Sequence, residues 1–306
     1  MAEIREIANG LAFPEGPVWM PDGSVVLVEI AAGRVTRVLP DGSKRAIAEP
    51  GGGPNGAALG PDGLLYVTNN GGSFSYHRLG GFLIPGPTPP EHRGGRIERV
   101  DLEAGKVEVL YDRCNGRSLR APNDLVFDAH GGFWFTDHGA THERERDRTG
   151  VFYAKADGSE IREVIFPLDG PNGIGLSPTG DRVFVAETYT GRVWWWSVPR
   201  PGEVAAAGGF GPAGGTLLAG LAGYQLLDSL AVDAEGFVCV ATIVNGGVTA
   251  ISPDGAKIEH HALPDPLVTN VCFGGADLRT AFCTLSGTGR LVSMPWPRAG
   301  LRLANG

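Results

Sequence analysis

Positive charge is scarce in this chain. Its 306 residues include 26 Lys and Arg against 34 Asp and Glu, which gives a formal net charge of −8, and no basic cluster interrupts the sequence. Nucleic acids and anionic membranes both attract proteins that present a positive patch or stripe. We therefore expect neither a nucleic acid nor a membrane as a partner.

Cysteine is also scarce, and its spacing is uninformative for metals. The four cysteines are Cys114, Cys239, Cys272 and Cys283. They form no C-x-x-C pair and no zinc-finger spacing, and three of them lie in apolar, strand-like runs. We expect buried, reduced thiols that act as small hydrophobic side chains.

Long apolar segments are missing or interrupted. Charged residues occupy positions 3, 5 and 6, where a signal peptide needs an apolar core, so we expect a cytoplasmic protein. Residues 204–227 carry no charge and are numerous enough to cross a bilayer. However, this run contains seven glycines and a proline, which disfavour a helix. We expect a loop there and no membrane span.

Glycine and proline, by contrast, are abundant. The 48 Gly and 23 Pro make up about 23% of the chain, roughly twice their usual share. Hydrophobic residues still account for 42%, so the chain can bury a core. A folded chain with so many turn-forming residues has many short elements, which favours an all-β fold.

One sequence pattern occurs six times. A polar residue opens a short apolar run, a turn follows, and a β-rich strand comes next. The six opening residues are Glu15, Asn55, Asn123, Asn172, Asp228 and Asn270. A further amphipathic strand, beginning at a glycine, follows each hairpin, so each copy supplies about four strands.

Four-stranded units repeated along a chain are typical of propeller blades. We therefore predict one domain over residues 1–306, a six-bladed β-propeller whose four-stranded antiparallel blades surround a central channel. Residues 4–7 are expected to pair with the last blade and close the ring. Trp194, Trp195 and Trp196 follow one another in a strand, where alternate side chains face opposite sides. We expect them to pack within and between blades.

The longest interval between copies contains an insertion at about residues 71–95. Phe74, Tyr76, Phe82 and Leu83 make this segment too apolar for a purely solvated loop. Long loops in compact domains are often functional, so we expect a lid over one channel mouth. A flap over a sheet edge and a contact between subunits are the alternatives.

The six opening side chains would converge on the channel if each inner strand begins with one of them. Converging amide and carboxylate oxygens suit a hard divalent cation such as Ca²⁺, Mg²⁺ or Mn²⁺. No His or Cys stands at an opening position, which argues against a closed structural zinc site. A cation with few protein ligands can polarise a carbonyl or lower the pKa of water, so hydrolysis of an ester-like bond is the expected chemistry.

Four short blocks resemble the gluconolactonase family that also contains regucalcin, the senescence marker protein. They are residues 13–19 (FPEGPVW), 121–124 (APND), 170–173 (GPNG) and 227–229 (LDS). The resemblance extends from about residue 10 to residue 295, and the glutamate block is its most specific part. It implies a six-bladed propeller that hydrolyses lactones, often sugar lactones, with a metal ion.

Carried over by position, the resemblance implies that Glu15, Asn172 and Asp228 bind the metal. Asn123 would contact the substrate or the metal shell and contribute to catalysis. Asp228 would also be the general base, or it would only bind the metal while water bound to the cation attacks. Family members use different cations, and we expect Ca²⁺ ahead of Zn²⁺, Mn²⁺, Mg²⁺ or Fe²⁺.

Three further residues are candidate substrate contacts. Arg120 lies just before Asn123, His138 ends the second strand of the third copy, and Tyr224 precedes Asp228. The charged run at residues 142–148 is expected to be a solvated loop.

The function we predict is metal-dependent opening of a small lactone by a monomer or small homo-oligomer. One alternative keeps the fold and metal but acts on aryl esters or organophosphates. The other is a non-catalytic propeller that binds a ligand or cation. Burying two carboxylates together is costly and argues against this last alternative.

Overall fold

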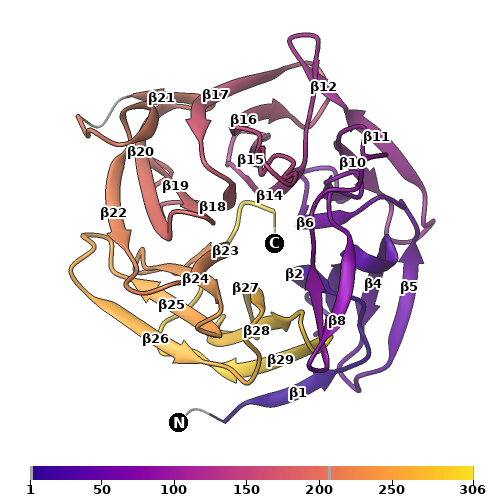
Figure 1. Cartoon of the computed structure of the whole chain (residues 1–306). Helices are drawn as coiled ribbons and strands as arrows, with labels where there is room; N and C mark the ends of the chain where they lie inside the picture. The colour runs from indigo at the N-terminus through magenta and orange to yellow at the C-terminus, as the bar shows by residue number, and fades with distance from the viewer. Residues whose placement is uncertain (1–2, 206–207, 306) are drawn as a thin grey trace.

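The computed structural model describes residues 3–205 and 208–305, and this part of the chain is built almost wholly from β-strands. Figure 1 shows six sheets arranged as a ring around a central channel. Within the described residues, the helical segments are two 3₁₀ turns, η1 (Ile30–Ala32) and η2 (Pro212–Gly214). The predicted six-bladed propeller is confirmed.

We number the blades I to VI along the chain and give their strands from the channel outward. Blade I contains β2 (Pro14–Trp19), β3 (Val25–Glu29), β4 (Arg34–Val38) and β5 (Lys44–Ala48). Blade II contains β6 (Pro54–Leu59), β7 (Leu65–Asn69), β10 (Arg96–Val100) and β11 (Val107–Tyr111). Blade III contains β14 (Pro122–Phe127), β15 (Gly132–Asp137), β16 (Thr149–Lys155) and β17 (Ile161–Leu168).

The other three blades follow the same plan with small variations. Blade IV contains β18 (Pro171–Leu176), β19 (Arg182–Glu187) and β20 (Arg192–Arg200), which pairs with both β21 (Glu203–Ala205) and β22 (Thr216–Gly220). Blade V contains β23 (Leu226–Val232), β24 (Val238–Ile243), β25 (Gly247–Ile251) and β26 (Ile258–Ala262). Blade VI contains β27 (Val268–Gly274), β28 (Thr280–Leu285), β29 (Arg290–Pro295) and β1 (Arg5–Ala8). Two hairpins lie outside the blades, β8 (Tyr76–Leu79) with β9 (Phe82–Pro85), and β12 (Arg113–Cys114) with β13 (Arg117–Ser118).

The first strand closes the ring as predicted. β1 pairs antiparallel with β29, with Arg5 opposite Ser293, so the N-terminal strand is the outer edge of the last blade. This pairing joins segments from the two ends of the chain into one sheet.

Each inner strand changes register close to its opening polar residue. In blade I the shift falls between Glu15 and Val18, and in blade V it falls between Leu227 and Leu230. Equivalent shifts occur in the inner strands of blades II, III, IV and VI. Such bulges bend a strand and redirect a side chain. They fit side chains that turn away from the blade and into the channel.

Hydroxyl side chains tie neighbouring blades together at the same level. Thr136 of blade III donates to the backbone oxygen of Asn172 in blade IV at 2.6 Å. Thr188 of blade IV donates to the Leu227 oxygen in blade V at 2.7 Å. Thr68 of blade II makes the corresponding bond to the Asn123 oxygen in blade III. The backbone that carries the opening residues is therefore held by the preceding blade.

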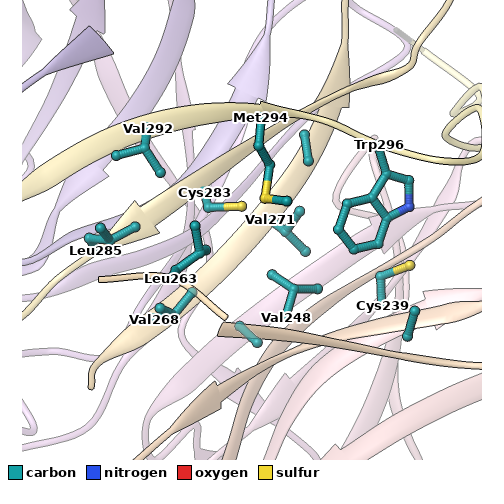
Figure 2. Close-up of a cluster of buried hydrophobic side chains, with 13 residues drawn as sticks. Cys239, Val248, Leu263, Val268, Val271, Cys283, Leu285, Val292, Met294 and Trp296 are labelled. Atoms are coloured by element: carbon teal, nitrogen blue, oxygen red, sulfur yellow. The ribbon is translucent and has the colours of Figure 1, made fainter. Parts of the chain in front are cut away.

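The apolar core lies in the seams between blades. Figure 2 shows the cluster between blades V and VI, which includes Cys239, Cys283, Met294 and Trp296. All four cysteines of the chain are free thiols, and all but the half-buried Cys272 are buried, as the sequence predicts.

The tryptophan run is also part of this packing. Trp196 is fully buried, while Trp194 and Trp195 are half-buried against the clusters on either side of blade IV. This confirms the expected role in packing between blades.

The loop expected at residues 204–227 is wrong in part, because this run contains β22, which pairs with β20 in blade IV. Residues 206 and 207 of this run lie outside the described part, as do residues 1 and 2 of the N-terminal segment. No helix in the part of the chain that the structure describes is long and apolar enough to cross a membrane.

Candidate active site

Hydrogen bonds at one end of the channel join opening side chains to neighbouring blades. Glu15 accepts hydrogen bonds through Oε2 from Asn270 Nδ2 at 2.7 Å and from the Gly16 amide at 2.6 Å. Asn172 Oδ1 accepts from the Ser229 hydroxyl at 3.4 Å, and Ser229 is the neighbour of Asp228. These bonds join blade I to blade VI and blade IV to blade V at this end of the channel.

The two carboxylates are buried together. Burial raises the pKa of Glu15 well above its usual range, and the charge of Asp228 raises it further. Burial likewise raises the pKa of Asp228, to about 7, although a hydrogen bond from Asn172 opposes the shift. The ion pairs among the described residues include no Lys or Arg bound to either carboxylate. Among the described residues, no Lys or Arg side chain therefore compensates the negative charge of the pair.

This donor set fits a divalent cation. Two carboxylates and an amide oxygen are hard ligands, and a cation between them would offset the cost of burying two negative charges. The described residues contain no group of three or more His, Cys, Asp and Glu side chains suited to a metal. The proposed ligands Glu15, Asn172 and Asp228 do not form such a group, because Asn172 is an asparagine.

Asn123 and Asp124 open the inner strand of blade III. Asn123 is buried, and its Oδ1 has no hydrogen-bond partner within residues 3–205 and 208–305. Burial raises the pKa of Asp124 to about 7, although its backbone hydrogen bonds oppose the shift. The charge of Asp124 in turn raises the pKa values of Glu15 and Asp228. An orphaned buried acceptor such as Asn123 Oδ1 calls for a ligand atom or a water.

The other three predicted contacts have different surroundings. His138 is buried and directly follows β15, whose last residue, Asp137, pairs with Pro122 beside Asn123. Its Nε2 atom lies 3.3 Å from the Tyr189 hydroxyl. Burial lowers the pKa of His138 to about 4, so it is a neutral side chain. Arg120 forms an ion pair with Asp147 at 2.7 Å. Tyr224 is 76% exposed and is not brought to the carboxylates.

Asp147, the partner of Arg120, belongs to the charged run at residues 142–148. The run is mostly exposed, as expected, but its charges do not simply compensate one another. Arg146 pairs with Asp169 at 2.6 Å and stacks on the Tyr189 ring at 3.8 Å. The run therefore packs against the rim of blades III and IV.

The β8–β9 hairpin packs at the same channel end. Tyr76, Leu83 and Ile84 pack against an apolar cluster that contains Phe13 and Leu267. Phe13 and Leu267 directly precede the inner strands β2 and β27, so this cluster lies at the opening end of the channel. In Figure 1 the hairpin runs from blade II across blade I toward β29.

The opposite end of the channel contains a cavity. This cavity of about 510 Å³ extends from the level of Gly16 and Asp124 to the far ends of the inner strands. The C-terminal segment lies over its mouth, where Leu301 donates to the Val232 oxygen and Asn305 to the Leu59 oxygen. The carboxylate pair therefore stands between this cavity and the hairpin.

Three residues at the candidate site are not indicated as ligands by the sequence pattern. Asn270 is an opening residue, and its place in the sixfold register is the signal that could have included it. Asp124 had no separate signal, because it follows Asn123 in what reads as an ordinary strand start. Tyr76 reaches the site only through the fold of the inserted hairpin.

The comparisons with known proteins agree with this architecture. Residues 13–287 match the family model described as SMP-30/Gluconolactonase/LRE-like region. A gluconolactonase of Zymomonas mobilis is 27% identical over 304 residues, covering 89% of this chain and 76% of that protein.

Two solved structures share the fold at lower identity. A gluconolactonase from Xanthomonas campestris superimposes with a TM-score of 0.75 at 22% identity, covering 97% of this chain and 90% of that one. A calcium-binding protein, regucalcin, from Agrobacterium tumefaciens gives a TM-score of 0.74 at 17% identity, covering 99% of this chain and 98% of that one. Since the family model spans nine-tenths of the sequence, this chain belongs to the SMP-30/gluconolactonase/LRE-like family.

Proposed function

We propose that this protein opens the ester bond of a small lactone, a sugar lactone or a close relative, with a divalent cation held by Glu15, Asn172 and Asp228. The chain is a lactone-hydrolysing enzyme, a carboxylic ester hydrolase, in keeping with its family and with the named gluconolactonase relative. The proposed cation is supported by the buried pair of carboxylates, Glu15 and Asp228, which has no Lys or Arg partner among the described residues.

The cation would be held by oxygen ligands from three blades. When bound, it would polarise the lactone carbonyl and make water more acidic. Calcium is our first choice because hard oxygen ligands suit it and because a structural neighbour is described as a calcium-binding protein. Zn²⁺, Mn²⁺, Mg²⁺ and Fe²⁺ are the other ions to test.

The side chains of the site divide the remaining work. Asp228 is the proposed general base: an oxygen of its carboxylate takes a proton from the attacking water. The water oxygen bonds to the carbonyl carbon, the ring carbon–oxygen bond breaks, and the departing oxygen receives the proton from Asp228. The product is the open hydroxy acid. Asn123 offers its orphaned Oδ1 to a substrate hydroxyl and so orients the ring.

Arg120 and His138 are proposed to line the same mouth. Arg120 would have to share its guanidinium between Asp147 and a substrate oxygen. His138, neutral and buried beside Tyr189, would contribute a hydrogen bond and no charge.

The test is hydrolysis of a panel of γ- and δ-lactones, including glucono-1,5-lactone, followed by acid release. Each lactone is assayed after chelation and after adding back each of the five cations. We expect turnover that chelation removes and one cation restores. Full activity after exhaustive chelation would overturn the metal-dependent mechanism.

The same panel should include aryl esters and an organophosphate. Turnover of these compounds with no turnover of lactones would replace the proposed substrate class. Tight cation binding without turnover of any compound would favour a binding protein.

A further inference from the structure

The inserted hairpin brings a tyrosine hydroxyl to the buried carboxylates. The Tyr76 ring lies 5.2 Å from the Phe13 ring, measured between centroids, and packs in the apolar cluster beside the channel. Phe13 stands two residues before Glu15 and adopts a left-handed backbone conformation, with φ of 57°. A bulky residue seldom takes that conformation, and such strain is most often found at functional sites.

The Tyr76 hydroxyl itself is close to the site. The Tyr76 ring packs on Phe13, two residues before Glu15, which places this side chain beside the strand that carries Glu15. Burial raises the pKa of the Tyr76 hydroxyl, and the charges of Glu15 and Asp228 raise it further. The hydroxyl is therefore protonated and can donate a hydrogen bond.

Tyr76 is half-buried, and its hydroxyl differs from those of four other tyrosines in having no partner among the described residues. Tyr66 and Tyr111 donate to backbone oxygens, and Tyr153 donates to Asp128 at 2.9 Å. The Tyr189 hydroxyl contacts His138 and Thr141. The Tyr76 hydroxyl is buried, yet it has no partner among the described residues. Buried tyrosine hydroxyls normally find one, because leaving such a group unpaired costs about 1–3 kcal/mol.

Two more unpartnered polar atoms lie on the segment that leads into the hairpin. They are Asn70 Nδ2 and Ser73 Oγ, both buried within the part of the chain that the structure describes. The segment from Asn70 to Tyr76 thus contains three buried polar atoms that have no hydrogen-bond partner among the described residues. A purely structural flap has no need for such groups, whereas the roof of a site for a polar molecule does.

We propose that Tyr76 is a substrate-contacting residue, whose hydroxyl donates a hydrogen bond to an oxygen of the bound lactone from the hairpin side. This inference rests on the proposed function, because it places the substrate between the hairpin and the carboxylates. The lactone lies under a roof that is apolar at Phe13 and Leu83 and polar at the Tyr76 hydroxyl. Small cyclic esters with several hydroxyl groups on the ring fit this arrangement.

The variant Tyr76→Phe tests the proposal, because it removes the hydroxyl and keeps the ring that packs against Phe13. We expect kcat/KM for glucono-1,5-lactone to fall about tenfold, the effect of one lost hydrogen bond. The affinity for the non-hydrolysable glucono-1,5-lactam, measured by calorimetry with the cation present, should fall by about the same factor. The thermal midpoint should stay the same or rise, since the hydroxyl has no partner among the residues that the structure describes.

Tyr111→Phe is the matched control. Its hydroxyl donates to the backbone oxygens of Lys155 and Glu160, in the seam between blades II and III. This variant should lose stability and keep its kcat/KM and lactam affinity. The two variants should therefore show opposite patterns.

The outcomes separate this inference from the proposed function. Unchanged kcat/KM and lactam affinity in Tyr76→Phe, with an active parent protein, would overturn the role of Tyr76 alone. A parent that binds the lactam but hydrolyses no lactone would overturn the proposed function, and a weaker lactam complex in Tyr76→Phe would still support the contact. A parent that neither binds nor hydrolyses would overturn both.

Discussion

The hydroxyl of Thr136 on blade III donates a hydrogen bond to the backbone oxygen of Asn172 on blade IV, across 2.6 Å. The same hydroxyl accepts from the Asp124 amide at 3.1 Å. One side chain thus ties the start of its own inner strand to a proposed metal ligand in the next blade. The position of Asn172 therefore depends on a contact between blades as well as on its own strand.

Replacing Thr136 with Val should weaken this junction. The isosteric methyl group leaves the Asp124 amide and the Asn172 oxygen without this partner, so the free energy of unfolding should fall by about 2 kcal/mol. Denaturant unfolding measures the change, and Thr136→Ser, which keeps the hydroxyl, is the control. Equal stability of the Val and Ser variants would contradict the importance of the bond.

Gly173 should not tolerate a side chain. A Cβ atom there would lie 2.5 Å from the Leu230 amide and 2.7 Å from the Asp228 oxygen, both backbone atoms of blade V. We expect Gly173→Ala to lower the free energy of unfolding by about 1–3 kcal/mol, because the backbone has to shift, and to lower activity by displacing Asp228.

Gly220→Ala is the comparison for that variant. A Cβ atom at Gly220 would be no nearer than 3.8 Å to any neighbour. This variant should keep both activity and stability. Similar losses at the two positions would show that close packing of the inner strands is not the cause.

Adding the preferred cation should stabilise the protein against heat. A ligand at about 100 times its dissociation constant adds about 2.7 kcal/mol when it binds only the folded state. Glu15→Gln should lose most of this gain, since it removes one of two charged ligands, while Glu103→Gln on the surface should retain it. Thermal unfolding with chelator and with cation gives the answer, and a full gain in Glu15→Gln would exclude Glu15 as a ligand.

Asp228→Asn should reduce turnover by about 100-fold or more, which is the usual contribution of a general base. Because the amide still has an oxygen donor, cation binding should weaken less than turnover does. Steady-state kinetics at saturating cation separates the two effects. Retention of turnover in Asp228→Asn would rule out the base, whereas turnover that recovers fully at high cation concentration would assign Asp228 to metal binding alone.

The buried His138 should make stability depend on pH. Its pKa is lowered to about 4 in the folded protein, from an ordinary value of 6.5, because burial disfavours the charged ring. The unfolded state therefore binds the extra proton first, and stability is lost as pH falls from 6.5 toward 4, by up to about 1.4 kcal/mol per pH unit.

His138→Asn should remove this share of the loss. The comparison is the difference in unfolding free energy between pH 7 and pH 5 for the parent and the variant. His130→Asn, at an exposed position, should behave like the parent. An identical pH dependence in parent and His138→Asn would contradict the burial of a neutral His138.

Much of the fold could be predicted from the sequence because a propeller repeats its local signals. Each of the six opening residues is followed by an apolar run, a turn and a strand, and the pairing of strands within a blade is local along the chain. Even the closure by β1 was predictable, since residues 4–7 form a strand with no partner nearby in sequence. The candidate ligands Glu15, Asn172 and Asp228 stand at equivalent places in this repeat.

Contacts between distant segments could not be predicted in the same way. No local pattern indicates that Arg120 pairs with Asp147, that Tyr224 stays exposed, or that His138 is buried beside Tyr189. These outcomes depend on how loops from different blades meet at the channel mouth.

By itself, then, the sequence determined the number of blades, the strands within them and the row of polar residues that faces the channel, because each is encoded by short-range periodicity. Only the tertiary structure decided the electrostatics of that row and the placement of the hairpin over it. The pKa values of Glu15 and Asp228 are raised because ring closure buries two acidic residues from different blades side by side. Tyr76 approaches them because its hairpin packs on Phe13 and Leu267, which belong to blades at opposite ends of the chain.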